Sequence, residues 1–192
     1  HACQFATRAE LSASVLGLQS LHALSLHASG NAQEGHAIVS TAINDHGGRS
    51  PFDVRLTAHL TLLQIDRALG LSPEAFDERL KPILDKARKK KMAWHTTWAL
   101  ILRGEALLEA GRSDEAEKDL TEAIKIAQKN ADRPQFWKAS YWLGRVFEQR
   151  LQYERALGSY RVAALTVNEL AMDLDDDRYR EPFLAQPEVR EV

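Results

Sequence analysis

The stretch LLEAGRSDEA, residues 107–116, decides the fold of this chain. An apolar helical run ends at Gly111, and a second helix with small residues on its buried side follows. The same arrangement surrounds Gly30 and Gly70, so the glycines recur at intervals of 40 and 41 residues, and the next step falls on Leu151. A fixed period of this size is typical of stacked repeats. The sequence therefore predicts an array of helical pairs, but it does not say what the array binds.

Composition and charge exclude several classes of protein. Of the 192 residues, 44% are apolar and 27% charged, and the net charge of −2 gives no general attraction to nucleic acid or anionic membranes. No apolar run approaches the ~20 residues of a membrane span. The single cysteine, Cys3, excludes an internal disulfide framework and favours a reducing, cytoplasmic compartment. The chain begins with neither Met nor a signal peptide, so we expect a segment of a longer polypeptide.

Four helical hairpins can be placed along the chain. Apolar residues form broad helical stripes rather than an alternating pattern, and no stretch shows the signals of a β-strand. The predicted hairpins cover about residues 8–45, 51–91, 92–130 and 133–172 of an array over residues 1–172.

Capping residues predict where several of these helices begin. An Asn or Ser followed by acidic residues, or by a proline at the first helical position, is typical of a helix start. Such starts lie at Asn31, where Glu34 completes a capping box, at Ser50, at Ser72 and at the run 113–115. Pro82 is expected to kink its helix or to end it early.

The remaining residues, 173–192, form an acidic linker and a tail. A repeat array needs a cover over the outer face of its last hairpin. A short helix over about residues 179–185 could lay Tyr179, Phe183 and Leu184 over that face. We therefore expect a capping tail.

The chain resembles the tetratricopeptide repeat family, whose unit is a helix–turn–helix of about 34 residues. The third and fourth hairpins carry the family's small and apolar landmark positions most clearly. These are Gly104, Leu107, Gly111, Ala116, Leu120 and Ala123, and then Leu143, Gly144, Phe147, Tyr153, Ala156, Tyr160 and Ala163. The resemblance implies a right-handed α-solenoid of four hairpins with longer helices than the standard unit. The tail is also similar to the ends of repeat arrays in large bacterial signalling and regulatory proteins.

Residues that could carry catalysis are hard to find. The seven histidines form no HExxH or Cys/His pattern, although His59 and His95 lie on first helices of adjacent hairpins and could meet. Phosphate-binding loops and a nucleophile elbow are missing from the sequence, and Cys3 is expected to lie at a frayed end of the chain. We therefore expect no catalytic residues, no cofactor, no metal and no enzymatic activity.

A basic run over residues 86–91 has two interpretations. Five cations could attract phosphate groups. They also crowd a helix end, where positive charge complements the helix dipole, and no aromatic residues lie between them. The solvated helix end is the preferred interpretation, so no nucleic acid partner is expected. The acidic run 173–177 could pair with these cations in another copy.

Aromatic residues gather on the first helices of the third and fourth hairpins. The resemblance implies that first helices line a concave surface where ligands bind, and Arg and aromatic side chains are typical of binding hot spots. The inward positions carried over from the family, here called the inward set, are Gln64, Arg67, Trp98, Ile101, Glu105, Glu109, Lys138, Tyr141, Arg145 and Glu148. Trp98 and Tyr141 could be exposed in this groove or could belong to the core between hairpins.

The favoured function is a non-catalytic scaffold module that binds a peptide or helix in its groove, within a larger regulatory protein. One alternative is a sensor domain in which a ligand or peptide changes the pitch of the superhelix. Another is a module for homo-oligomerisation. The expected partner is a protein or peptide, with self-association possible and no membrane partner.

Overall fold

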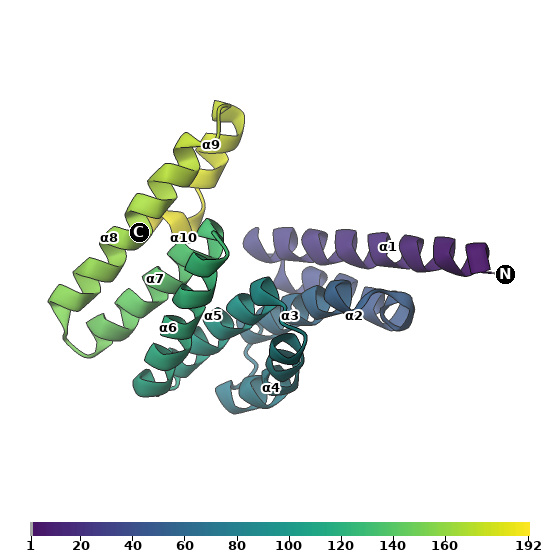
Figure 1. Ribbon diagram of the computed structural model, residues 1–192, viewed down its shortest axis with the longest axis horizontal. Helices are drawn as coiled ribbons and strands as arrows, with labels where there is room; N and C mark the ends of the chain where they lie inside the picture. Colours follow the sequence, from purple (N-terminus) through teal and green to yellow (C-terminus); the bar gives the residue numbers. More distant parts are fainter. Residues whose placement is uncertain (1) are drawn as a thin grey trace. The chain divides into compact units, whose positions relative to one another are not determined.

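The computed structural model describes the backbone of residues 2–192 and the side chains of residues 10–186 and 189–192. Every regular element within residues 2–192 is a helix, so the predicted all-α class is confirmed (Figure 1). The long helices of this range are α1 (Ala2–Ala28), α2 (Ala32–His46), α3 (Phe52–Ala68), α4 (Pro73–Lys89), α5 (Ala93–Glu109), α6 (Ser113–Lys129), α7 (Arg133–Gln149) and α8 (Tyr153–Met172). The short ones are the 3-10 helix η1 (Gly47–Arg49), α9 (Asp177–Leu184) and α10 (Pro187–Arg190).

From α4 onward the helices begin at a constant interval. Their first residues are 73, 93, 113, 133 and 153, so each start lies 20 residues after the one before. Helices α4 to α7 have 17 residues each, followed by turns of three residues. The period of about 40 residues therefore consists of two equal helix-and-turn units, which is consistent with a helical repeat.

The turns between these helices share one backbone geometry. In each, the middle residue of the turn has positive φ, and the N–H of the next residue donates to a carbonyl five residues earlier, as in a Schellman motif. Arg112 donates to Leu107 O at 2.8 Å, and Gln152 donates to Phe147 O at 2.9 Å. The residues with positive φ are Gly30, Gly70, Lys91, Gly111, Ala131 and Leu151. The turn predicted at Leu151 is confirmed, although its φ of 60° belongs to a residue with a Cβ.

The first of two compact units comprises residues 1–95. Within it α1 packs along α2, both contact α3, and α4 packs on α3 (Figure 1). The core side chains within each helix are spaced three or seven residues apart, as expected for helical faces. They are Leu16, Ala23, Val39, Ala42, Ala58 and Ile65.

The second unit comprises residues 96–192 and has α7 at its centre, with α6 and α8 both packed against it. One core cluster joins α5, α6 and α7 through Leu107, Leu108, Ala116, Leu120 and Val146. Another joins α7, α8 and α10 through Trp137, Tyr141, Ala163, Val167 and Val189. A Cβ on Gly144 would lie 2.6 Å from the Tyr160 ring, so this glycine allows α8 to approach α7 closely.

Several predicted helix caps differ from the structure. Ser72 is confirmed, since its hydroxyl accepts a hydrogen bond from Ala75 N at 3.3 Å. Asn31 occupies the N-cap position of α2 without a side-chain cap bond. Ser50 is not a cap, because α3 begins one residue later and the Ser50 hydroxyl donates to His46 O at 2.9 Å. Ser113 is the first residue of α6 rather than its cap, and its hydroxyl donates to Gln149.

The prediction that Pro82 ends its helix early is wrong, because α4 continues through it to Lys89. A proline inside a helix costs about 3 kcal/mol. Beyond it, however, Leu84 and Ala87 are 1% and 0% exposed. Burying a leucine side chain contributes about 1.5–3 kcal/mol, and the buried face of α4 also includes Phe76 and Leu80. Burial along this face therefore outweighs the cost of the proline.

The tail covers the end of the second unit only in part. Phe183 on α9 packs against the cluster that contains Trp137. Tyr179 and Leu184 are 65% and 39% exposed, so the prediction that they cover the last hairpin is wrong. Their place is taken by Val189, which is 6% exposed, because the chain turns after α9 and brings α10 onto α7 and α8.

Candidate functional site

The inward set divides between the two units. Gln64 and Arg67 are half-buried on α3 in the first unit. The other eight residues lie on α5 and α7 in the second unit, and their burial varies widely. Ile101 and Tyr141 are buried, Trp98, Glu105 and Lys138 are half-buried, and Glu109, Arg145 and Glu148 are exposed. The candidate site is the one that the second unit forms by itself.

Three aromatic side chains of α7 belong to the core of this unit. Trp137, Tyr141 and Phe147 are between 3% and 5% exposed. Of the two alternatives left open for Tyr141, groove or core, its burial fits the core, and Ile101, at 4%, is also buried.

Three members of the inward set meet on one face of α7. Tyr141, Arg145 and Glu148 are spaced four and three residues apart, which places them on the same side of a helix. Arg145 donates from Nη1 to Tyr141 Oη at 2.9 Å, and its Nε lies 3.5 Å from Glu148 Oε2. Tyr160 on α8 donates to Glu148 Oε2 at 2.7 Å. Tyr141 donates in turn to Glu191 Oε2 at 2.5 Å, so these five residues form one Tyr141 network.

The electrostatics of the Tyr141 network keep both phenols protonated. Burial, followed by the hydrogen bond to Glu191, raises the pKa of Tyr141 above its usual value. Burial and the hydrogen bond to Glu148 raise the pKa of Tyr160 well above its usual range. Both hydroxyls therefore remain donors to carboxylates throughout the physiological pH range.

Arg145 lies over an aromatic base. Its guanidinium carbon is 6.0 Å from the Tyr141 ring centroid and 5.9 Å from that of Trp142. The two rings pack edge to face with centroids 5.3 Å apart. On the same helix, Lys138 Nζ lies 5.5 Å from the Trp137 ring centroid. Two cations thus stand on a surface of buried rings, which is the composition of an anchor for acidic groups.

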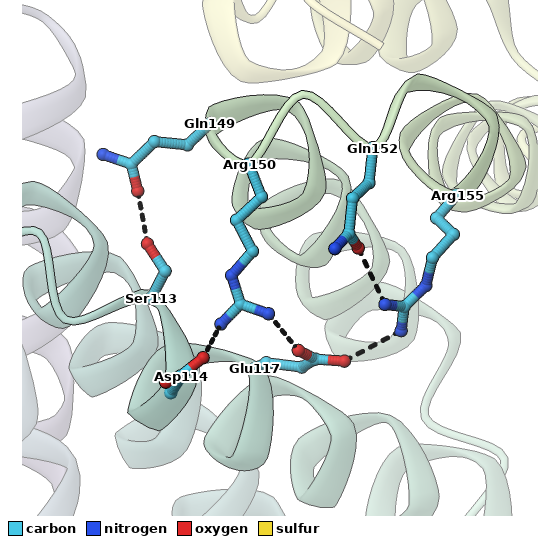
Figure 2. Close-up of polar contacts among 7 residues, drawn as sticks. All are labelled: Ser113, Asp114, Glu117, Gln149, Arg150, Gln152 and Arg155. Carbon is cyan, nitrogen blue, oxygen red and sulfur yellow. Dashed lines mark hydrogen bonds and ion pairs between the residues drawn. The ribbon is translucent and has the colours of Figure 1, made fainter.

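A second polar cluster in this unit joins the start of α6 to the turn between α7 and α8. Figure 2 shows the Arg150 guanidinium between two carboxylates, with Arg150 Nη2 2.6 Å from Asp114 Oδ1 and Nη1 2.5 Å from Glu117 Oε2. Arg155 reaches the other oxygen of Glu117 at 2.8 Å. Burial raises the pKa of Glu117, but the hydrogen bonds from Arg155 and Arg150 outweigh burial and lower it below its usual value.

The two arginine clusters differ in what they leave exposed. The Arg150 side chain is 20% exposed and bonds two carboxylates closely, so its charge is neutralised within the fold. The side chains of Arg145 and Glu148 are 45% and 54% exposed, and their atoms are 3.5 Å apart. Arg150 is therefore suited to holding turns together, and Arg145 can still interact with an approaching group.

The sequence-based prediction missed Tyr160 and Glu191 as members of the site. A signal for Tyr160 existed, because Gly144 and Tyr160 have the same sequence separation as Gly104 and Leu120. A Cβ on Gly104 would lie 2.7 Å from the Leu120 side chain. Both pairs place a residue of one helix against a glycine of the previous helix. Glu191 had no local signal, since its contact with Tyr141 spans 50 residues.

The remaining predicted features lie elsewhere. His95 Nε2 is 3.0 Å from Thr57 Oγ1 and 3.1 Å from Asp53 O. Among the described side chains, no group of three or more His, Cys, Asp or Glu residues could hold a metal ion. The Cys3 side chain lies outside the described residues.

The basic and acidic runs both lie at helix ends. Lys86, Arg88 and Lys89 occupy the last turn of α4. In the acidic run, Asp173 pairs with Arg133, and Asp176 caps α9 by accepting from Arg178 N at 2.9 Å. Of the helices described, none is long and apolar enough to cross a membrane.

The sequence was compared with models of protein families and with curated proteins. No family model matches the chain, and no curated protein matches it significantly.

Proposed function

We propose that this chain is a non-catalytic interaction module of the tetratricopeptide type, a right-handed solenoid whose inward helix faces bind a peptide or helix of a partner protein. The equal spacing of helix starts and the uniform turns support the repeat architecture. The module would serve within a larger regulatory protein.

The observation that carries this proposal is the environment of Arg145. It is an exposed cation on an aromatic base, supported by Tyr141 and only loosely paired with Glu148. Interface hot spots are enriched in Arg, Trp and Tyr at sites where rings exclude water. An arginine held in this way loses little conformational freedom when a carboxylate or carbonyl oxygen approaches.

The test uses peptides selected on the intact chain from a phage-displayed random library. Arg145→Ala is expected to weaken the binding of the selected peptides about tenfold or more, measured by fluorescence polarisation. The matched control is Arg161→Ala, since Arg161 is an exposed arginine on α8 outside the network, and it should change binding less than about twofold. Equal losses in both variants, with unchanged thermal melting, would contradict the proposal.

A second candidate function, self-association, is favoured by the outer face of α1. Leu11, Leu18 and Leu21 are between 63% and 67% exposed and follow spacings of seven and three residues. Such a stripe is typical of a helix that packs on another helix. Sedimentation across a concentration range tests it: a dimer that Leu18→Glu dissociates would support this function, and a monomer at every concentration would exclude it.

A further inference from the structure

We infer that residues 185–192 occupy the binding surface of α7 as an internal ligand, and that this surface recognises a carboxylate flanked by aliphatic side chains. This inference rests on the proposed function, since it names the chemistry of the same site. A partner segment of that pattern would have to displace the tail in order to bind.

The tail segment contacts α7 through one buried apolar group and one acid. Val189 belongs to one buried cluster with Trp137 and Tyr141 of α7 and Ala163 and Val167 of α8. Glu191 accepts the hydroxyl proton of Tyr141 at 2.5 Å, and Val192 packs against the edge of the same cluster. The segment thus presents an aliphatic side chain, an acid and a second aliphatic side chain within four residues.

The polar end of the site is built for an acidic group. Tyr141 receives a hydrogen bond from Arg145 and donates one to Glu191, so the positive charge of Arg145 polarises the hydroxyl that holds the carboxylate. Glu148 stands on the other side of Arg145, where it accepts from Tyr160. Glu191, one of two glutamates in residues 185–192, is therefore placed on the Tyr141 side of the arginine.

The tail is held by few other contacts. No residue of α9 is fully buried, although Phe183 packs against the Trp137 cluster, and α10 has only four residues. Arg180 fixes the start of the tail by donating to Ala171 O at 3.0 Å and to Leu174 O at 2.5 Å. Segments with so little buried surface open at a low cost in free energy, while the helices beneath them stay folded. The contacts of Val189 and Glu191 can therefore be exchanged for those of another chain.

A tethered segment competes through its effective concentration. A short tether keeps the tail at an effective concentration on the order of millimolar, so a weak free peptide of the same pattern binds poorly while the tail is in place. The apparent affinity for such a peptide falls by the fraction of molecules whose surface is open. Weakening the tail contacts should raise that fraction and should strengthen peptide binding.

The experiment uses the full chain and a fluorescein-labelled peptide with the sequence of residues 186–192. We expect the peptide to bind the double variant Val189→Ser/Glu191→Gln about tenfold or more tightly than the unsubstituted chain. Adding Tyr141→Phe to the double variant should remove this gain, because the donor to the carboxylate is lost. A control peptide with Gln in place of the acid at position 191 should bind neither chain.

Hydrogen exchange distinguishes local release of the tail from unfolding of the second unit in the double variant. Amides of residues 185–192 should exchange faster in the double variant, while those of α6, α7 and α8 keep their protection. Glu191→Gln alone, which retains Val189 in the core cluster, should give a smaller gain in the same direction. Equal binding of the peptide to the double variant and the unsubstituted chain, or binding to neither, would overturn the inference.

Failure of the inference and failure of the proposed function give different results. If library-selected peptides still depend on Arg145 while the tail peptide does not bind, the interaction module stands and the internal ligand is wrong. If the selected peptides ignore Arg145 as well, the proposed function itself is wrong.

Discussion

Two threonines on α3 have hydroxyl groups in different surroundings. Thr57 donates to Asp53 O at 3.1 Å and lies 3.0 Å from the Nε2 of His95. Thr61, one turn later, is 0% exposed, and its hydroxyl has no hydrogen-bond partner among the described residues. A buried polar group without a partner costs about 1–3 kcal/mol.

Replacing the unpartnered hydroxyl by a methyl group should stabilise the protein. We expect Thr61→Val to raise the free energy of unfolding by about 1 kcal/mol, measured by urea denaturation, because the valine loses no hydrogen bond. The matched control, Thr57→Val, removes two contacts and should lower it. An equal effect of the two substitutions would show that Thr61 has a partner.

At the scale of single residues, the spacing of residues along a helix predicted which side chains share a face. It predicted less well how deeply each side chain is buried. Spacing placed Tyr141, Arg145 and Glu148 together on α7, and their contacts agree. The burial of Tyr141 depends on residues 189–192, which fold back onto it from far along the chain. Local periodicity contains no information about such a contact, so the choice between groove and core stayed open.

At the scale of helices and turns, one motif recurs with different residues. Gly70 and Gly111 have positive φ values of 97° and 74°, which glycine adopts without strain. Leu151 occupies the equivalent position at 60°, and its side chain is 70% exposed, so it gains little from burial. The packing of the surrounding helices therefore holds Leu151 in a strained left-handed backbone conformation.

Relieving that strain should stabilise the turn. Leu151→Gly is expected to raise the free energy of unfolding by about 1 kcal/mol, since a left-handed conformation costs a non-glycine residue about 1–2 kcal/mol. The reverse change at the equivalent turn, Gly111→Ala, should lower it by a similar amount. Thermal melting followed by circular dichroism measures both, and a destabilised Leu151→Gly variant would contradict this account.

Helix positions were predictable from sequence because the period agrees with glycine turn signals at Gly30, Gly70 and Gly111 and extends to Leu151. The fourth hairpin was placed within one residue of α7 and α8. Cap chemistry was less predictable, since Ser50 and Ser113 found other hydrogen-bond partners once neighbouring segments packed. The continuity of α4 through Pro82 likewise depends on burial against the rest of the fold.

At the scale of the whole chain, the first unit contains the two histidines whose pKa values are lowered. Burial, with smaller contributions from Lys86, Arg55 and Arg79, lowers the pKa of His59 below 6.5. Burial also lowers that of His95, although its contacts with Asp53 act in the opposite direction. The folded state therefore favours the neutral imidazoles, and the unfolded state takes up protons at a higher pH.

The sign of this linkage predicts acid sensitivity. The contribution of these two histidines to the free energy of unfolding should be fully present above their unfolded-state pKa. It should fall as the pH drops from about 7.5 to about 5.5, because in this range the histidines of the unfolded chain take up protons more readily than those of the folded chain. His59→Gln should reduce this fall in the urea midpoint. After correction for the slower intrinsic exchange at lower pH, amide protection should decrease in α3 and α4 more than in α6 and α7. A variant with an unchanged pH profile would show that His59 does not contribute.

Because the helices start at an even interval, the chain could gain or lose one complete helix pair without a change in the spacing of the other helices. A block that runs from one turn to the equivalent turn, such as residues 113–152, contains the helix pair α6 and α7 with matching ends. Tandem duplication of the corresponding stretch of gene would join each new helix to a neighbour like its original one. The duplicated protein should show a proportionate gain in helical circular dichroism and a steeper urea dependence. The constant interval between helix starts therefore allows the chain to lengthen by duplication of a helix pair.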